Sequence, residues 1–103
     1  MFHATPDGND LESVITLRGE LDMATVPALR SAVLGELDTD VRRIVLELET
    51  LAFIDSAGLQ GIVGLHERAR RTGVRLVLRH PSSTASRVLS ITGLDEVLHV
   101  EAG

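Results

Sequence analysis

The sequence contains no cysteine, tryptophan, tyrosine or lysine, so all ten of its basic residues are arginine. A chain without cysteine has no disulfide framework, and a reducing cytoplasm is its default location. A chain without lysine cannot build a Walker-type phosphate loop, form a Schiff base or use a Ser-Lys dyad. These absences exclude several classes of nucleotide-binding protein and covalent enzyme.

Side chains for nucleic-acid binding are also scarce. The formal net charge is −5, and the only aromatic residues are Phe2 and Phe53. Direct binding to DNA or RNA uses a basic patch and often an aromatic stacking platform, and this composition supplies neither. We therefore expect no direct contact with nucleic acid.

Signals for export or membrane insertion are missing as well. Residues 1–10 lack the basic and apolar regions of a signal peptide, and no apolar run approaches the length of a membrane span. We expect a cytoplasmic protein without membrane insertion. With 103 residues, 44% of them hydrophobic, the chain has the size of one compact domain over residues 1–103, and a monomer is the default state.

Strand and helix patterns alternate along the chain. Strands are predicted over residues 13–18, continuing to Asp22, and over 44–48, 74–78 and 97–100. A first helix is predicted to begin at Ala24 or Thr25, with Leu29, Val33 and Leu37 on one face. A second helix is predicted over residues 55–72, before Gly73. A third is predicted from Ser82 or Ser83 to Gly93, with apolar residues at Ala85, Val88, Leu89 and Ile91. This order is typical of a small α/β domain.

A short polar segment, Asp55-Ser56-Ala57-Gly58-Leu59, separates two apolar stretches. Phe53 and Ile54 before it have the pattern of a buried strand and its exit, and the helix after it begins with Asp55 as N-cap. Ser56 then lies among unpaired N–H groups at the positive end of the helix dipole, which favours a phosphate. Ser56 is therefore a candidate phosphoacceptor, although capping alone, with Gly58 allowing close packing, explains the same residues.

Known enzyme motifs do not fit this segment. Gly58, Gly61 and Gly64 have the wrong spacing for a dinucleotide fingerprint, and close packing of the helix on the sheet is the favoured explanation. A hydrolase elbow requires glycine where Ile54 stands, and an aspartyl phosphate on Asp55 would require a lysine. The four histidines are scattered in sequence, so we expect solvated or rim positions and no metal set: His3, His66, His80 and His99.

The arrangement resembles the anti-sigma factor antagonists, which are single STAS domains. The resemblance covers nearly the whole chain and rests on Gly19-Glu20-Leu21-Asp22, Leu46-Glu47-Leu48, the segment from Phe53 to Leu59, Gly73, and Ile91-Thr92-Gly93-Leu94. It implies a mixed, mainly parallel sheet of four to five strands with helices largely packed on one face. It also implies a bacterial regulator of transcription in stress response or sporulation.

The resemblance further implies roles for individual residues. Ser56 matches the serine that an anti-sigma factor serine kinase phosphorylates, and Asp22 and Asp55 match acidic residues beside it. Met23, Thr25, Gly58 and Leu59 match the partner-binding surface. Two positions depart from the common pattern: Ala57, where many members have Ser or Thr, and Glu47, near which many have Asp.

Partner switching is the function that this resemblance implies. The unphosphorylated form binds the kinase and releases a sigma factor, phosphorylation ends the binding, and a serine phosphatase is the further partner. ATP and Mg²⁺ belong to the kinase, so we expect no cofactor, no metal and no enzymatic activity in this chain. The alternative is a constitutive STAS scaffold subunit in a cytoplasmic or transporter-associated complex, which keeps the fold but lacks the switch.

Overall fold

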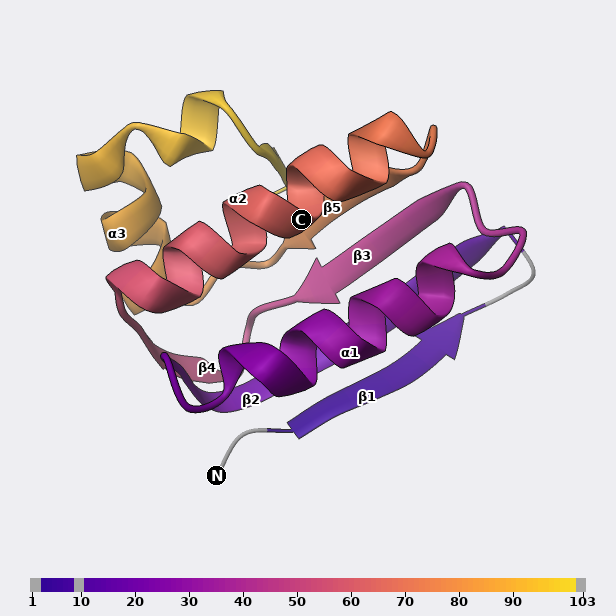
Figure 1. The fold of residues 1–103 in the computed structure, drawn as a ribbon. Helices are drawn as coiled ribbons and strands as arrows, with labels where there is room; N and C mark the ends of the chain where they lie inside the picture. Colours follow the sequence, from indigo (N-terminus) through magenta and orange to yellow (C-terminus); the bar gives the residue numbers. More distant parts are fainter. Residues whose placement is uncertain (1–2, 9–10, 102–103) are drawn as a thin grey trace.

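The computed structural model describes residues 3–8 and 11–101. Along the chain the elements are β1 (His3–Gly8), β2 (Glu12–Leu21), α1 (Val26–Leu37), β3 (Arg43–Glu47), β4 (Leu51–Ile54), α2 (Ser56–Arg71), β5 (Arg75–Arg79), α3 (Ser83–Thr92), the short 3-10 helix η1 (Leu94–Glu96) and β6 (His99–Glu101) (Figure 1). None of the helices in these residues is long and apolar enough to cross a membrane.

The strands form one mixed sheet in the order β1-β2-β3-β5-β6, and β4 pairs with the end of β2 outside this path. β1 pairs antiparallel with β2, and the other pairs are parallel. This confirms the expected α/β class with a mainly parallel sheet. The described residues form a sheet of six strands, beyond the four or five expected. β1 was not predicted, and Phe53 and Ile54, read as the end of a buried strand, belong to the separate strand β4.

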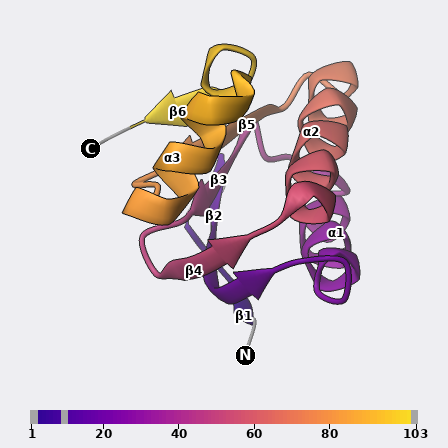
Figure 2. The ribbon, with the colours of Figure 1, turned by 90° about the vertical axis from the view of Figure 1, so that its left-hand side faces the viewer.

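Of the three α-helices in the described residues, two cover one face of the sheet. α1 and α2 lie side by side there, whereas α3 lies apart from them and packs against β4 (Figures 1 and 2). The register aligns Ile15 with Leu46 and Leu46 with Leu78, and alternate side chains of a strand share a face. These residues therefore form a continuous apolar layer under α1 and α2, and all three are at most 1% exposed.

Two large apolar side chains, Phe53 and Ile91, are exposed, and burial was expected for Phe53. Phe53 is 44% exposed, because β4 buries only its two end residues, Leu51 and Ile54. Ile91 is 77% exposed, because it lies about 200° around α3 from the buried Leu89. The prediction of a buried position was therefore wrong for Phe53.

The helix ends follow local signals. Asp55 is the N-cap of α2, and Gly73 and Gly93 adopt left-handed backbone conformations after α2 and α3. Ser82 is the cap of α3, since its hydroxyl accepts from the Ala85 N–H at 3.2 Å. The last strand starts later than predicted, at His99, because η1 occupies the preceding segment.

Candidate functional site

The site is built where β2 and β4 end side by side. Leu21, the last residue of β2, pairs with Ile54, the last residue of β4, in parallel register. Asp22 and Asp55 are the next residues of the two strands, so both loops leave the same edge of the sheet. Sites in open α/β sheets commonly lie at such an edge.

Asp55 organises the start of α2. Its backbone is extended, its Oδ1 accepts the Gly58 N–H at 2.8 Å, and its carbonyl accepts the Leu59 N–H at 3.0 Å. Ser56 is the first residue of the helix and is exposed. Asp55 provides the N-cap hydrogen bond, so helix capping accounts for the presence of Asp55. It does not account for the hydroxyl of Ser56.

The segment from Asp22 to Thr25 forms a tight turn. Asp22 Oδ1 accepts the N–H groups of Ala24 and Thr25 at 3.0 and 3.1 Å. The Thr25 hydroxyl donates to the Glu20 carbonyl at 2.9 Å and accepts the Asp22 N–H at 2.8 Å. Thr25 stands at the N-cap of α1, but its side chain makes no capping bond to that helix, contrary to the capping predicted for it. The turn leaves the Met23 side chain 79% exposed.

Gly58 positions α2 against β2. A Cβ atom at Gly58 would lie 2.6 Å from the Leu21 carbonyl oxygen and 3.1 Å from Cγ1 of Ile54. Helix-to-sheet packing therefore explains Gly58. At Gly61 the close neighbour is Cγ1 of Val26 on α1, at 3.0 Å, so this glycine allows close packing between two helices and not on the sheet as expected. At Gly64 no atom lies within 4 Å, so close packing does not explain that glycine.

The seven residues singled out in the sequence thus differ in exposure. Ser56 and Met23 are exposed, while Gly58 is buried and Leu59 is only 6% exposed. Leu59 still contributes to a mostly apolar groove of about 460 Å³ beside Ser56, lined by Ser56, Leu59, Gln60, Val63, Gly64 and Leu94. Leu94 was not predicted to be part of this surface. The signal that could have identified it is the Ile91-Thr92-Gly93-Leu94 motif at the end of α3.

Two histidines that are far apart in sequence meet at the other end of α2. The rings of His66 and His99 contact edge to face, with centroids 5.4 Å apart, and both line a pocket of about 200 Å³. Burial lowers the pKa of His99 below its ordinary value, and the charges of Arg75 and His66 lower it further. Among the described residues one group has metal-ligand spacing: Glu47, Glu49 and His80. His66 and His80 are half-buried and His99 is exposed, as expected for rim or solvated histidines, but the contact between His66 and His99 was not predicted.

The family model of the STAS domain matches residues 4–102. The chain belongs to the STAS domain family. It is 32% identical over 89 residues to the anti-sigma-B factor antagonist of Staphylococcus aureus, covering 86% of this chain and 82% of that protein. This relationship places it among the anti-sigma factor antagonists, a family of regulatory binding proteins.

Solved structures agree with this assignment. An anti-sigma factor antagonist from Mycobacterium paratuberculosis superimposes with a TM-score of 0.83 at 27% identity, covering 100% of this chain and 87% of that one. The anti-sigma factor antagonist SpoIIAA in its unphosphorylated form gives 0.79 at 27% identity, covering 97% and 87%. The Bacillus cell fate determinant SpoIIAA in the phosphorylated form gives 0.73 at 27% identity, covering 97% and 90%.

Proposed function

We propose that this STAS domain is a partner-switching anti-sigma factor antagonist controlled by phosphorylation of Ser56. In its unphosphorylated form it binds an anti-sigma factor serine kinase, which releases a sigma factor. The observation that carries the proposal is the exposed Ser56 at the first position of α2, on a helix start whose cap Asp55 provides. That SpoIIAA has been solved in phosphorylated and unphosphorylated forms supports a switch of this kind.

The partner-binding surface in this proposal combines the two loops at the end of β2 and β4. The Asp22–Thr25 turn presents the exposed Met23, and the start of α2 presents Ser56. The apolar groove along Leu59, Val63 and Leu94 adjoins Ser56 and offers a recess for an apolar side chain of the partner. Gly58 and Leu59 are buried beneath this surface, and their role in the proposal is to fix the position at which α2 begins.

The chemistry of the switch needs nothing from this chain except the hydroxyl. The kinase transfers the γ-phosphoryl group of its ATP to Ser56 Oγ, the hydroxyl proton leaves, and ADP is released with the Mg²⁺ of the kinase site. A serine phosphatase hydrolyses the ester and returns the hydroxyl and inorganic phosphate. The ten basic residues include no lysine for a phosphate loop, which is consistent with nucleotide binding by the partner.

Charge is sufficient to end the binding. A phosphate adds about −1.5 to −2 charges next to Asp55 and near the Asp22 turn. At a separation of about 5 Å and an effective dielectric near 20, each pair of unit charges repels by about 3 kcal/mol, more than the ~0.3–1 kcal/mol that a helix N-terminus contributes. In an interface the dianion must also lose water, which costs several kcal/mol. A net loss of about 4 kcal/mol weakens binding by a factor of about 1,000.

The test is incubation of the pure protein with a candidate anti-sigma factor serine kinase from the same organism, ATP and Mg²⁺. Intact-mass measurement should show one added phosphoryl group, and peptide mapping should locate it on Ser56. Ser56→Ala should remain unmodified under the same conditions. Phosphate on Ser82, Ser83 or Thr25, or undiminished modification of Ser56→Ala, would overturn the assignment.

A further inference from the structure

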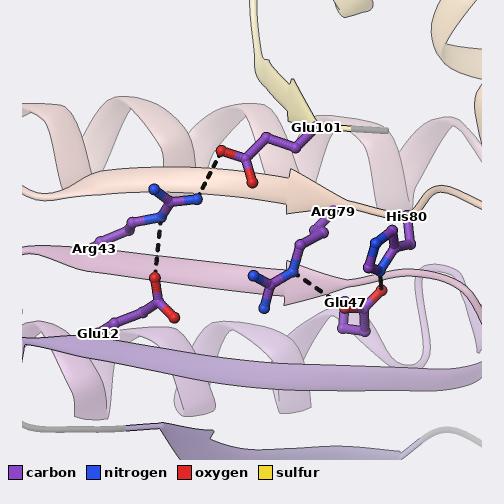
Figure 3. Close-up of polar contacts among 6 residues, drawn as sticks. All are labelled: Glu12, Arg43, Glu47, Arg79, His80 and Glu101. Atoms are coloured by element: carbon purple, nitrogen blue, oxygen red, sulfur yellow. Dashed lines mark hydrogen bonds and ion pairs between the residues drawn. The ribbon is translucent and has the colours of Figure 1, made fainter. Parts of the chain in front are cut away.

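A second cluster of functional side chains lies at the carboxyl ends of β3 and β5. Glu47 is the last residue of β3, and it pairs in register with Arg79, the last residue of β5. His80 follows Arg79 directly, and Glu49 follows Glu47 by two residues. The cluster has Glu47, Arg79 and His80 on the face of the sheet opposite α1 and α2 (Figure 3). It is therefore separate from the Ser56 surface and independent of the function proposed for it.

The ligand atoms of this cluster are already close together. His80 Nδ1 lies 2.9 Å from Glu47 Oε1. One ligand atom from each of Glu47, Glu49 and His80 lies within 4.8 Å of the others. Metal bonds of about 2.0–2.2 Å place two ligand atoms of one tetrahedral ion roughly 3–3.5 Å apart. The pair formed by Glu47 and His80 has almost that spacing, and the exposed Glu49 needs only a small side-chain movement to complete it.

The backbone holds the two turns in place. His80 adopts a left-handed conformation with φ of 51°, which histidine tolerates better than most residues. Its N–H donates to the Glu101 carbonyl at 2.9 Å, and the Leu48 N–H donates to the Arg79 carbonyl at 2.9 Å. The imidazole and the Glu47 carboxylate are thus positioned before any ion binds, which lowers the entropic cost of binding.

We infer that Glu47, Glu49 and His80 form a binding site for a divalent transition-metal ion, with Zn²⁺ as the representative ion. One imidazole and two carboxylates suit zinc, whereas Mg²⁺ and Ca²⁺ prefer oxygen ligands alone. Arg79 Nε contacts Glu47 Oε2 at 3.3 Å, so it orients the carboxylate from the side away from His80. Its positive charge offsets one of the two carboxylates, and affinity is accordingly moderate.

The bound ion would connect the turn between β3 and β4 to the turn between β5 and α3. A protein contact already joins these segments, because the Ser82 hydroxyl donates to the Leu51 carbonyl at 2.8 Å. Zinc would add a second connection on the side of His80. Because an ion that binds only the folded state stabilises it, Zn²⁺ should raise the unfolding temperature.

Calorimetric titration of ZnCl₂ into the full chain at neutral pH tests the site. We expect one ion per chain, no competition from Mg²⁺ in excess, and a shift of the His80 ring resonances in NMR spectra. His80→Asn, which tolerates the left-handed backbone, should weaken binding at least about tenfold. Glu49→Gln changes an exposed side chain and should weaken it several-fold, with folding checked by circular dichroism.

His66→Gln is the matched control, because it removes a histidine outside the cluster, and it should bind as the unaltered chain does. Absence of zinc binding would overturn the proposal. So would binding that survives both His80→Asn and Glu49→Gln, or ring shifts confined to His66 and His99.

Discussion

The backbone N–H of Asp55 donates to the carbonyl of Leu21 at 3.2 Å, which ties the residue before Ser56 to the last residue of β2. Gly58 meets the same carbonyl from the first turn of α2, since a Cβ there would lie 2.6 Å from its oxygen. This one carbonyl therefore sets both the position of the N-cap and the approach of the helix. The geometry of the candidate site depends on it.

Gly58→Ala should destabilise the fold although alanine is the better helix former. The new methyl group must displace backbone, which costs about 1–3 kcal/mol and should lower Tm by roughly 5 °C or more. Gly64→Ala is the matched control in the same helix: its Cβ meets no atom within 4 Å, so it should stabilise by about 0.5–1 kcal/mol. Urea unfolding followed by circular dichroism compares them, and equal midpoints would contradict this packing.

The His66–His99 contact should make stability depend on pH. The pKa of His99 is lowered by burial, by Arg75 and by His66, so the folded state binds its proton less readily than the unfolded chain does. His99 therefore does not reduce the free energy of unfolding at a pH well above its ordinary pKa of 6.5. As the pH falls below 6.5 the unfolded chain takes up the proton more readily, and the free energy of unfolding decreases. His99→Gln should reduce the fall in Tm between neutral and mildly acidic pH. An identical pH profile in the variant would show that His99 does not cause it.

Local signals were enough to predict α2 and its ends. The N-cap Asp55 and the glycine after the helix, Gly73, both lie within one continuous segment, and the structure has the helix at Ser56–Arg71. The two candidate loops could be placed together because both follow strands that run in the same direction.

Features that depend on distant pairing could not be predicted from the sequence. The segment His3–Gly8 contains Pro6 and ends in glycine, so its sequence lacks the pattern of a strand. It becomes a strand by pairing with β2 at the edge of the sheet, where proline is tolerated. The exposure of Phe53 follows from β4 pairing with β2 outside the main path of the sheet. The contact between His80 and Glu47 likewise arises from the alignment of β3 with β5.

Met23→Arg should weaken binding to the kinase by more than about 1.4 kcal/mol, a factor of ten, because it places a long charged side chain at the centre of the proposed surface. Its thermal unfolding should hardly change, since the side chain is 79% exposed. Ile91→Arg is the matched control: this residue is 77% exposed on α3, and its substitution should leave affinity unaltered. Surface plasmon resonance with immobilised kinase measures both. An unchanged affinity for Met23→Arg would place the interface elsewhere.

Substitutions that change only the charge at position 56 separate a switch from a constitutive scaffold. Ser56→Ala should bind the anti-sigma partner about as well as the unaltered chain, because it removes a hydroxyl worth ~1 kcal/mol or less. Ser56→Asp and Ser56→Glu should bind far more weakly, since each adds a carboxylate beside Asp55 in a contact that excludes water, at a cost of a few kcal/mol. The phosphorylated protein should bind most weakly, because its charge is larger. Calorimetry measures the affinities, and circular dichroism verifies that every variant is folded. If the acidic variants and the phosphorylated protein all keep full affinity, the charge at Ser56 controls nothing, and a constitutive scaffold is the better description.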